Sequence, residues 1–127
     1  LDAVNMTDGL ITIEQYGHPT FCRITTPPDP DDVKRARTAL ERLFEIMEAC
    51  LCDILVADEI VTAVKFGFIS EDDVLRLMEK KPESMELILT GRGATEKLIA
   101  GADLVTEMAE IKHYYQKGIE ARKGIES

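Results

Sequence analysis

The clearest feature in the alternation of apolar and polar residues is a short apolar run that ends in two carboxylates. Residues 54–57 (ILVA) contain no polar side chain, and Asp58 and Glu59 follow directly. An uninterrupted apolar run of this length is typical of a strand that is buried on both faces at the centre of a parallel sheet. The two carboxylates then lie at the carboxyl end of the strand, where open α/β sheets bind ligands.

A helical pattern precedes this predicted strand. Asp29 and Pro30 suit the N-cap and first position of a helix, and Asp31 and Asp32 in the first turn favour the helix dipole. Apolar residues then recur at steps of three and four. They predict one face that packs on the sheet, formed by Val33, Ala36, Leu40, Leu43 and Met47.

Two further helices are predicted after the carboxylates. Residues 60–66 suit a short apolar helix that Gly67 ends. Ser70 and Asp73 form a capping box for a second helix, which ends before Pro82. Its buried face is expected to consist of Val74, Leu75 and Met78.

The remaining downstream segments alternate between strand and helix. We expect strands at residues 85–89 and 103–108, with a short helix at residues 95–100 between them. Such alternation specifies an α/β domain with a mainly parallel sheet and right-handed crossovers.

The amino-terminal part combines an alternating segment with a proline-rich loop. Residues 10–16 (LITIEQY) predict a strand that ends at Gly17, nearer a sheet edge than residues 54–57. Residues 18–30 hold four prolines and are expected to form an exposed loop. In that loop, His18 and Phe21 could recognise a ring system, and a solvated connector is the alternative.

Composition restricts the class of partner. The chain has 127 residues, enough for one α/β domain over residues 1–127, and a formal net charge of −9, which argues against a nucleic-acid or anionic-membrane surface. A small molecule or another protein is the expected partner. No run approaches a membrane span and no signal peptide opens the chain, so we expect a cytoplasmic protein. Because the chain begins at Leu1 without Met, we also expect further sequence upstream.

Three cysteines, Cys22, Cys50 and Cys52, are expected to be buried reduced thiols. A metal site at the last two is the alternative, but further ligands do not cluster near them in the sequence.

Two stretches of the sequence could take part in binding a nucleotide's phosphate groups. Asp58 stands where a Walker B carboxylate binds the Mg²⁺ that carries nucleotide phosphates. After the strand at 85–89, Thr90-Gly91-Arg92-Gly93 combines a guanidinium with glycines that permit close backbone approach, although a tight strand-to-helix turn explains the glycines equally well.

The last segment, residues 110–127, gathers basic residues in an otherwise acidic protein: Lys112, His113, Lys117, Arg122 and Lys123. A local basic cluster can hold a polyphosphate. A solvated helix or tail is the alternative interpretation.

Five ordered motifs carry a family resemblance: VADEI at 56–60, KFGFI at 65–69, LTGRGA at 89–94, ADLVTEM at 102–108 and IKHYYQKGIEARKGIE at 111–126. With these motifs the chain resembles the ATP:corrinoid (cob(I)alamin) adenosyltransferases of the CobA/BtuR type. ITIEQYG at 11–17 is similar to the family's segment before its corrinoid-facing loop, so the resemblance covers nearly the whole chain.

The resemblance implies a three-layer, P-loop NTPase-like (RecA-like) fold with a mainly parallel sheet. The family opens with a glycine-rich P-loop, GxxxxGK[ST], and this sequence contains no such motif. Residues 1–127 would then be the C-terminal two-thirds of the domain. The P-loop was either removed or omitted, or the chain is a variant that does not bind ATP in the family's way.

The resemblance also implies an activity, the transfer of the 5′-deoxyadenosyl group of ATP to Co(I) of cob(I)alamin or cobinamide with release of triphosphate. This reaction belongs to adenosylcobalamin biosynthesis or salvage. ATP, Mg²⁺ and a corrinoid are the implied ligands, and a flavoprotein reductant and a homodimer are the implied partners. A regulatory nucleotide-binding module, or an inactive fragment of the same fold, is the alternative.

The implied site has three parts. Asp58 and Glu59 would bind Mg²⁺, and Glu59 and Arg92 would act in catalysis. Phe21 and His18 would face the corrin ring. The implied nucleotide-binding residues are Thr90, Gly91, Arg92, Gly93, Lys112, His113 and Lys117.

Overall fold

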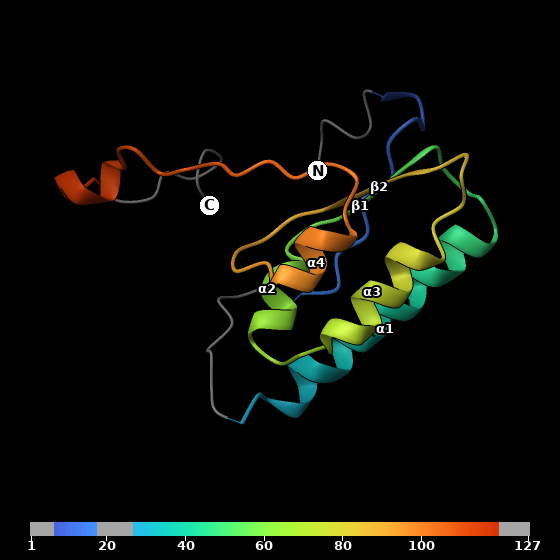
Figure 1. The fold of residues 1–127 in the computed structure, drawn as a ribbon, viewed down its shortest axis with the longest axis horizontal. Coiled ribbons are helices and arrows are strands. Elements are labelled where there is room, and N and C mark those ends of the chain that lie inside the picture. Colours follow the sequence, from blue (N-terminus) through green and yellow to red (C-terminus); the bar gives the residue numbers. More distant parts are fainter. Residues whose placement is uncertain (1–6, 18–26, 120–127) are drawn as a thin grey trace.

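The computed structural model describes residues 7–17 and 27–119 of the chain. Within these ranges the elements follow the order α1 (Pro30–Glu48), β1 (Ile54–Ala57), α2 (Ile60–Lys65), α3 (Glu71–Glu79), β2 (Glu86–Leu89) and α4 (Glu96–Gly101), and a short 3₁₀ helix, η2 (Tyr114–Lys117), comes last (Figure 1). Strands and helices alternate, so the predicted α/β class is confirmed.

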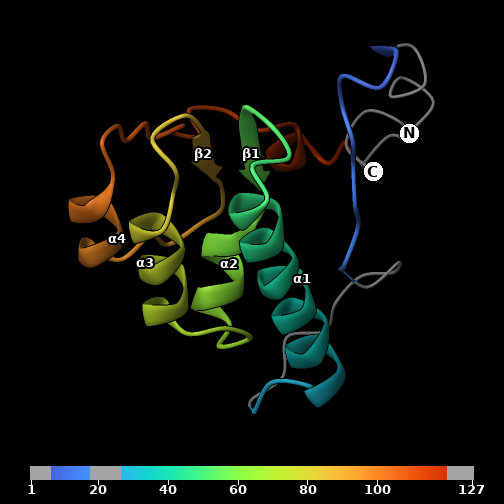
Figure 2. The same ribbon diagram turned by 90° about the vertical axis from the view of Figure 1, so that its right-hand side faces the viewer.

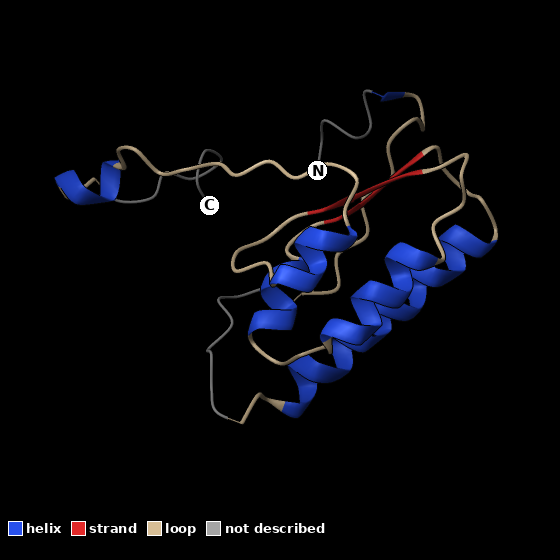
Figure 3. Cartoon of the chain, viewed as in Figure 1, coloured by secondary structure: helices blue, strands red, loops and turns tan. Residues whose placement is uncertain are grey.

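The two strands form a parallel pair in which Val56 lies opposite Ile88 (Figure 3). Parallel strands need a crossover connection, and here α2 and α3 supply it. In both ribbon views helices α1 to α4 lie on the same side of the strands (Figures 1 and 2). The second helical layer of a three-layer fold is not among the described residues.

The hydrophobic core lies between this helical layer and the sheet. Val74 and Leu77 of α3 have no exposed surface, and Met47 of α1 and Met85 before β2 are almost fully buried. The predicted buried face of α3 did not include Leu77, which is a core residue. Of the residues predicted there, Val74 is fully buried, and Leu75 and Met78 are only partly buried against the core.

The other face of the sheet is exposed, so the prediction that the first strand is buried on both faces is wrong for the described chain. Ile54 and Val56 are 58% and 51% exposed, and Ile88 of β2 is 46% exposed. Leu55 and Ala57, which point to the helical side, are buried. The apolar run therefore identified the strand correctly but not its environment.

Local capping chemistry determines where the helices begin and end, as predicted. The Asp29 carboxylate accepts the N–H of Asp31 at 2.8 Å at the start of α1. At the start of α3 the Ser70 hydroxyl accepts the N–H of Asp73, and the Asp73 carboxylate accepts the N–H of Ser70 in return. Gly67 follows α2 with φ 73, which is the left-handed conformation of a helix C-cap motif.

The predicted strand at residues 10–16 is wrong. Within the part of the chain that the structure describes, these residues pair with no strand, and they are mostly exposed. A side-chain contact holds the segment instead, since Arg42 of α1 donates from Nε and Nη2 to the Glu14 carboxylate. That contact, with a hydrogen bond from Tyr16, lowers the pKa of Glu14 to about 2, so the ion pair persists at neutral pH.

The predicted strand at residues 103–108 is also wrong. The segment leaves α4 without pairing to either strand, and Leu104 and Met108 are 85% and 94% exposed. An apolar pattern becomes a strand only when a partner edge satisfies its backbone groups, and none of the described residues provides that edge here.

The expectation of buried thiols is wrong for Cys50 and partly right for Cys52, which is half-buried. Cys50 is exposed and takes the left-handed position after α1 with φ 47, where its N–H and its thiol both donate to the Met47 carbonyl, at 3.1 and 3.6 Å. Cys22 lies outside the described residues. In the described ranges, no three His, Cys, Asp or Glu side chains gather as metal ligands, and no helix is long and apolar enough to cross a bilayer.

Candidate functional site

The candidate site begins where the carboxyl ends of β1 and β2 meet. The Thr90 hydroxyl, directly after β2, donates to Asp58 Oδ1 at 2.6 Å and accepts the backbone N–H of Glu59 at 2.9 Å. The two strands are parallel, so their carboxyl ends lie at the same edge of the sheet. One threonine side chain therefore connects the Asp58 carboxylate and the Glu59 backbone to the loop after β2.

Glu59 connects β1 to α2 with a strained backbone. Its φ of 61° and ψ of 15° lie in the left-handed region, which costs a side chain other than glycine about 1 to 3 kcal/mol. Glu59 occupies the N-cap position of α2, but its carboxylate does not cap the helix. Instead, the Thr62 hydroxyl donates a hydrogen bond to Glu59 Oε2, with 2.5 Å between the two oxygens.

The loop after β2 lies directly on the first turn of α2. The Arg92 N–H donates to the Thr62 hydroxyl at 2.9 Å. Gly91 has φ 139, and a Cβ there would stand 2.6 Å from the Thr62 backbone nitrogen, so only glycine fits. Gly93 has φ 82 and lies against the aliphatic part of Lys65. The glycines therefore permit close packing of loop against helix.

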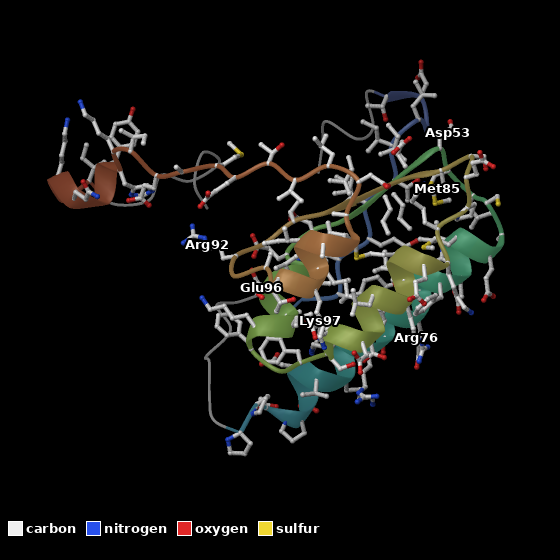
Figure 4. The ribbon with its side chains drawn as sticks, viewed as in Figure 1. Asp53, Arg76, Met85, Arg92, Glu96 and Lys97 are labelled. Atoms are coloured by element: carbon white, nitrogen blue, oxygen red, sulfur yellow. The ribbon has the colours of Figure 1, made fainter. Side chains whose placement is uncertain are left out.

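An ion pair connects α3 and α4. Lys97 Nζ lies 2.9 Å from Glu71 Oε2. A hydrogen bond from Thr95, followed by the Lys97 contact, holds the pKa of Glu71 below its usual value, and Glu71 raises the pKa of Lys97. Lys97 is thus engaged within the protein. Arg92 stands at the tip of the loop, and its side chain points outward (Figure 4).

The carboxylate pair has the chemistry of a Mg²⁺ site. The bonds to Thr90 and Thr62 use one oxygen of Asp58 and one of Glu59, and both residues are exposed. Mg²⁺ is commonly held by one or two carboxylates together with substrate phosphates and water. These two residues fit that requirement.

The structure brings part of the predicted site together. Asp58, Glu59 and the loop residues 90–93 share the carboxyl edge of the sheet. Lys112, His113 and Lys117 are exposed on the segment after α4, which extends away from the helices and the sheet in Figure 1. His18 and Phe21 lie outside the described residues.

Sequence reasoning missed Thr62, which contacts both halves of the site. The available signal was its position three residues after Glu59, which is the N3 position of α2. Residues at N-cap and N3 positions commonly exchange hydrogen bonds. The left-handed turn at Glu59, which directs its carboxylate to the Thr62 side chain, had no signal in the sequence.

Comparison with known proteins matches almost the entire chain to one family. The family described as ATP:corrinoid adenosyltransferase BtuR/CobO/CobP matches residues 2–127. A corrinoid adenosyltransferase of Sinorhizobium sp is 42% identical over 96 residues, covering 75% of this chain and 45% of that protein. The enzyme of that name from Pseudomonas aeruginosa is 35% identical over 95 residues, covering 75% of this chain and 47% of that protein.

The corrinoid adenosyltransferase of Escherichia coli (strain K12) is 28% identical over 95 residues, covering 75% of this chain and 48% of that protein. The chain thus spans about half the length of the curated relatives that it matches. The family match, in contrast, includes the carboxylate pair, the loop after β2 and the basic C-terminal segment. The chain therefore belongs to the ATP:corrinoid adenosyltransferase family BtuR/CobO/CobP.

Proposed function

We propose that the complete gene product transfers the 5′-deoxyadenosyl group of ATP to Co(I) of a corrinoid, with release of triphosphate. The observation that carries the proposal is the family match over residues 2–127. The arrangement of Asp58, Glu59 and Arg92 around one sheet edge supports it, because the reaction needs a place for Mg²⁺ and for a departing polyphosphate.

The fold that goes with this activity is a three-layer P-loop NTPase-like domain, in which residues 1–127 form a single α/β unit. The parallel pairing of β1 and β2 supports it, and so does the acidic residue pair directly after β1. Cytoplasmic location, a homodimer and a flavoprotein reductant are further parts of the proposal, and they rest on the family alone.

The reaction makes few chemical demands on protein side chains. The electron pair of Co(I) forms the new bond to the 5′ carbon of ATP, the bond from that carbon to the triphosphate oxygen breaks, and its electrons leave with the triphosphate. Co(I) is already a strong nucleophile, so no protein base is needed. The protein's part is to align the two substrates and to stabilise the growing negative charge.

The residues of the sheet edge divide these tasks. Asp58 and Glu59 would hold Mg²⁺, which when bound neutralises phosphate charge. Thr90 keeps the Asp58 carboxylate in place through its 2.6 Å hydrogen bond. The glycines at 91 and 93 allow backbone to approach the phosphates, and the Arg92 guanidinium would contact the leaving triphosphate.

The remaining proposed residues come from segments of the chain other than the loops at this sheet edge. Lys112, His113 and Lys117 would reach the triphosphate only if the segment after α4 folded back to the sheet edge when ATP binds. His18 and Phe21 would lie against the corrin ring and keep water from cobalt.

The direct test is an assay of the complete gene product with ATP, Mg²⁺ and cob(I)alamin that has been reduced chemically, so that reduction is not limiting. Adenosylcobalamin should appear in the absorption spectrum together with an equal amount of triphosphate. Absence of both products under these conditions would overturn the proposal. Separate titrations with ATP and with corrinoid would then distinguish a nucleotide-binding regulatory protein, which binds ATP alone, from a chain that binds neither.

A further inference from the structure

The Thr62 hydroxyl, on α2, bonds both to a carboxylate of the pair and to the backbone of the loop after β2, in addition to the direct contact that Thr90 of the loop makes with Asp58 and Glu59. It lies at 2.5 Å from Glu59 Oε2 and at 2.9 Å from the Arg92 backbone nitrogen. These two partners are 33 positions apart in the sequence, at 59 and 92. The Thr62 oxygen is thus a second connection between the two parts of the proposed site, beside that of Thr90.

The direction of both hydrogen bonds follows from the chemistry of the groups. A backbone N–H can only donate, so the Thr62 oxygen is the acceptor for Arg92. A hydroxyl has one proton, and an ionised carboxylate can only accept, so that proton points to Glu59. The hydroxyl therefore has one arrangement that satisfies both partners.

The backbone around Thr62 leaves little room for another arrangement. The Gly91 position that a Cβ would occupy lies 2.6 Å from the Thr62 nitrogen, 2.9 Å from its hydroxyl oxygen and 2.9 Å from Val61 Cβ. The Val61 N–H also donates to the Thr90 carbonyl at 3.1 Å. The loop is therefore pressed onto the first turn of α2 where the hydroxyl stands.

We propose that Thr62 is a positioning residue that sets the orientation of the Glu59 carboxylate for the metal and locks the Arg92 loop beside it. The identity of the metal and of the nucleotide in this inference rests on the proposed function. The hydrogen-bond geometry around Thr62 does not depend on it. The left-handed backbone of Glu59 directs its side chain back over α2. The Thr62 hydroxyl then holds one carboxylate oxygen, which restricts where the other can lie. Groups that bind and orient a metal ligand in this way typically change metal affinity or activity by about 10- to 100-fold when removed.

The test compares three variants of the complete gene product. Thr62→Val keeps the shape of the side chain and removes the hydroxyl, whereas Thr62→Ser keeps the hydroxyl and removes a methyl group. Thr38→Val is the matched control, because the Thr38 hydroxyl also donates within a helix, to the Lys34 carbonyl at 3.1 Å, on the exposed surface of α1.

The first measurement is the binding of Mn²⁺, a paramagnetic substitute for Mg²⁺, in the presence of ATP and without corrinoid. We expect Thr62→Val to weaken Mn²⁺ binding about 10-fold, and Thr62→Ser and Thr38→Val to retain the parent's affinity. Parent-like binding by Thr62→Val would overturn the inference, and so would equal losses in the serine and valine variants, since the hydroxyl would not then be the cause.

The second measurement is hydrogen exchange of the Arg92 amide, which needs no ligand. In Thr62→Val this amide loses its acceptor and should exchange about 2- to 10-fold faster than in the parent, as expected for one lost hydrogen bond. An unchanged exchange rate of the Arg92 amide would contradict the inference that the Thr62 hydroxyl locks the loop. Neither measurement involves transfer to cobalt. If the gene product has no adenosyltransferase activity, the proposed function is refuted, and these two measurements still decide the inference about Thr62.

Discussion

Glu59 has a backbone conformation that glycine would adopt without strain, φ 61 and ψ 15. A glycine there would, however, remove the carboxylate next to Asp58. A strained residue at the end of a strand is a reason to look for function at that position. The hydrogen bond from Thr62 shows what the strain achieves locally, because it holds the carboxylate at the first turn of α2, where the same hydroxyl accepts the Arg92 N–H.

The first prediction concerns this carboxylate. Glu59→Gln keeps the size of the side chain and removes the charge, so the fold should remain while turnover falls by about 10- to 100-fold at limiting Mg²⁺. The measurement is the rate of adenosylcobalamin formation as a function of Mg²⁺ concentration. Glu83→Gln, an exposed carboxylate before β2, is the control and should behave as the parent. An unchanged rate in Glu59→Gln would remove Glu59 from the site.

The second prediction compares two glycines. Gly91→Ala would place a Cβ 2.6 Å from the Thr62 nitrogen at a φ of 139, so we expect a loss of about 1 to 3 kcal/mol in the free energy of unfolding. Gly17→Ala meets nothing within 4 Å and should change stability by less than about 0.5 kcal/mol. Urea unfolding measures both. Equal stabilities of the two variants would contradict the packing of the loop on α2.

At the scale of elements, the sequence predicted what local chemistry determines. Asp29, Ser70 and Gly67 mark helix ends because their backbone and side-chain groups satisfy the helix termini without help from distant residues. The parallel pair β1–β2 followed from strand–helix alternation. The segments at 10–16 and 103–108 were mispredicted because their patterns needed a partner strand, which the pattern itself does not supply.

The site shows the same division between local and long-range information. Asp58, Glu59 and residues 90–93 were predictable because each follows a strand, and parallel strands end at one edge. Thr62 was not, because its role depends on the left-handed turn at Glu59 and on the close approach of Gly91, and both belong to the three-dimensional structure.

The third prediction tests the capping box of α3. Ser70→Ala should lower the free energy of unfolding by about 1 kcal/mol at pH 7. The Ser70 hydrogen bonds hold the pKa of Asp73 below its usual value of 3.8, so this part of the stability is complete above about pH 4 and is lost as the pH falls through the lowered pKa. The difference between parent and variant should therefore be smaller at pH 2 than at pH 7.

Urea unfolding at the two pH values measures this difference. Ser84→Ala, in the exposed turn before β2, is the control and should show little effect at either pH. A difference for Ser70→Ala that does not change with pH would mean that the Asp73 carboxylate contributes nothing through its charge.

At the scale of the whole molecule, net charge restricts where an anionic ligand can bind. A net charge of −9 repels a polyphosphate, so the proposed function requires a place where cations are concentrated locally. Arg92 stands beside the carboxylate pair, whereas Lys112 lies on the segment that leaves the body of the molecule (Figure 1). Whether that segment folds back onto the nucleotide decides how the site is completed.

The last prediction addresses this question with Arg92→Ala and Lys112→Ala in the complete gene product, assayed with chemically reduced cob(I)alamin. The interaction between a cation and the triphosphate strengthens as the leaving group gains negative charge. Each truncation should therefore remove about 2 to 4 kcal/mol of transition-state stabilisation, or about 30- to 1000-fold in kcat/KM. Lys34→Ala, an exposed cation of α1, is the control and should retain the parent value.

The two variants separate the parts of the site. Losses in both would mean that the C-terminal segment closes over the sheet edge during the reaction, although it extends away from that edge in this structure. A large loss for Arg92→Ala with none for Lys112→Ala would place the triphosphate at the loop after β2 and leave the C-terminal segment a structural role. If both variants keep more than about half of the parent kcat/KM, a change under about 0.4 kcal/mol, neither cation contacts the triphosphate.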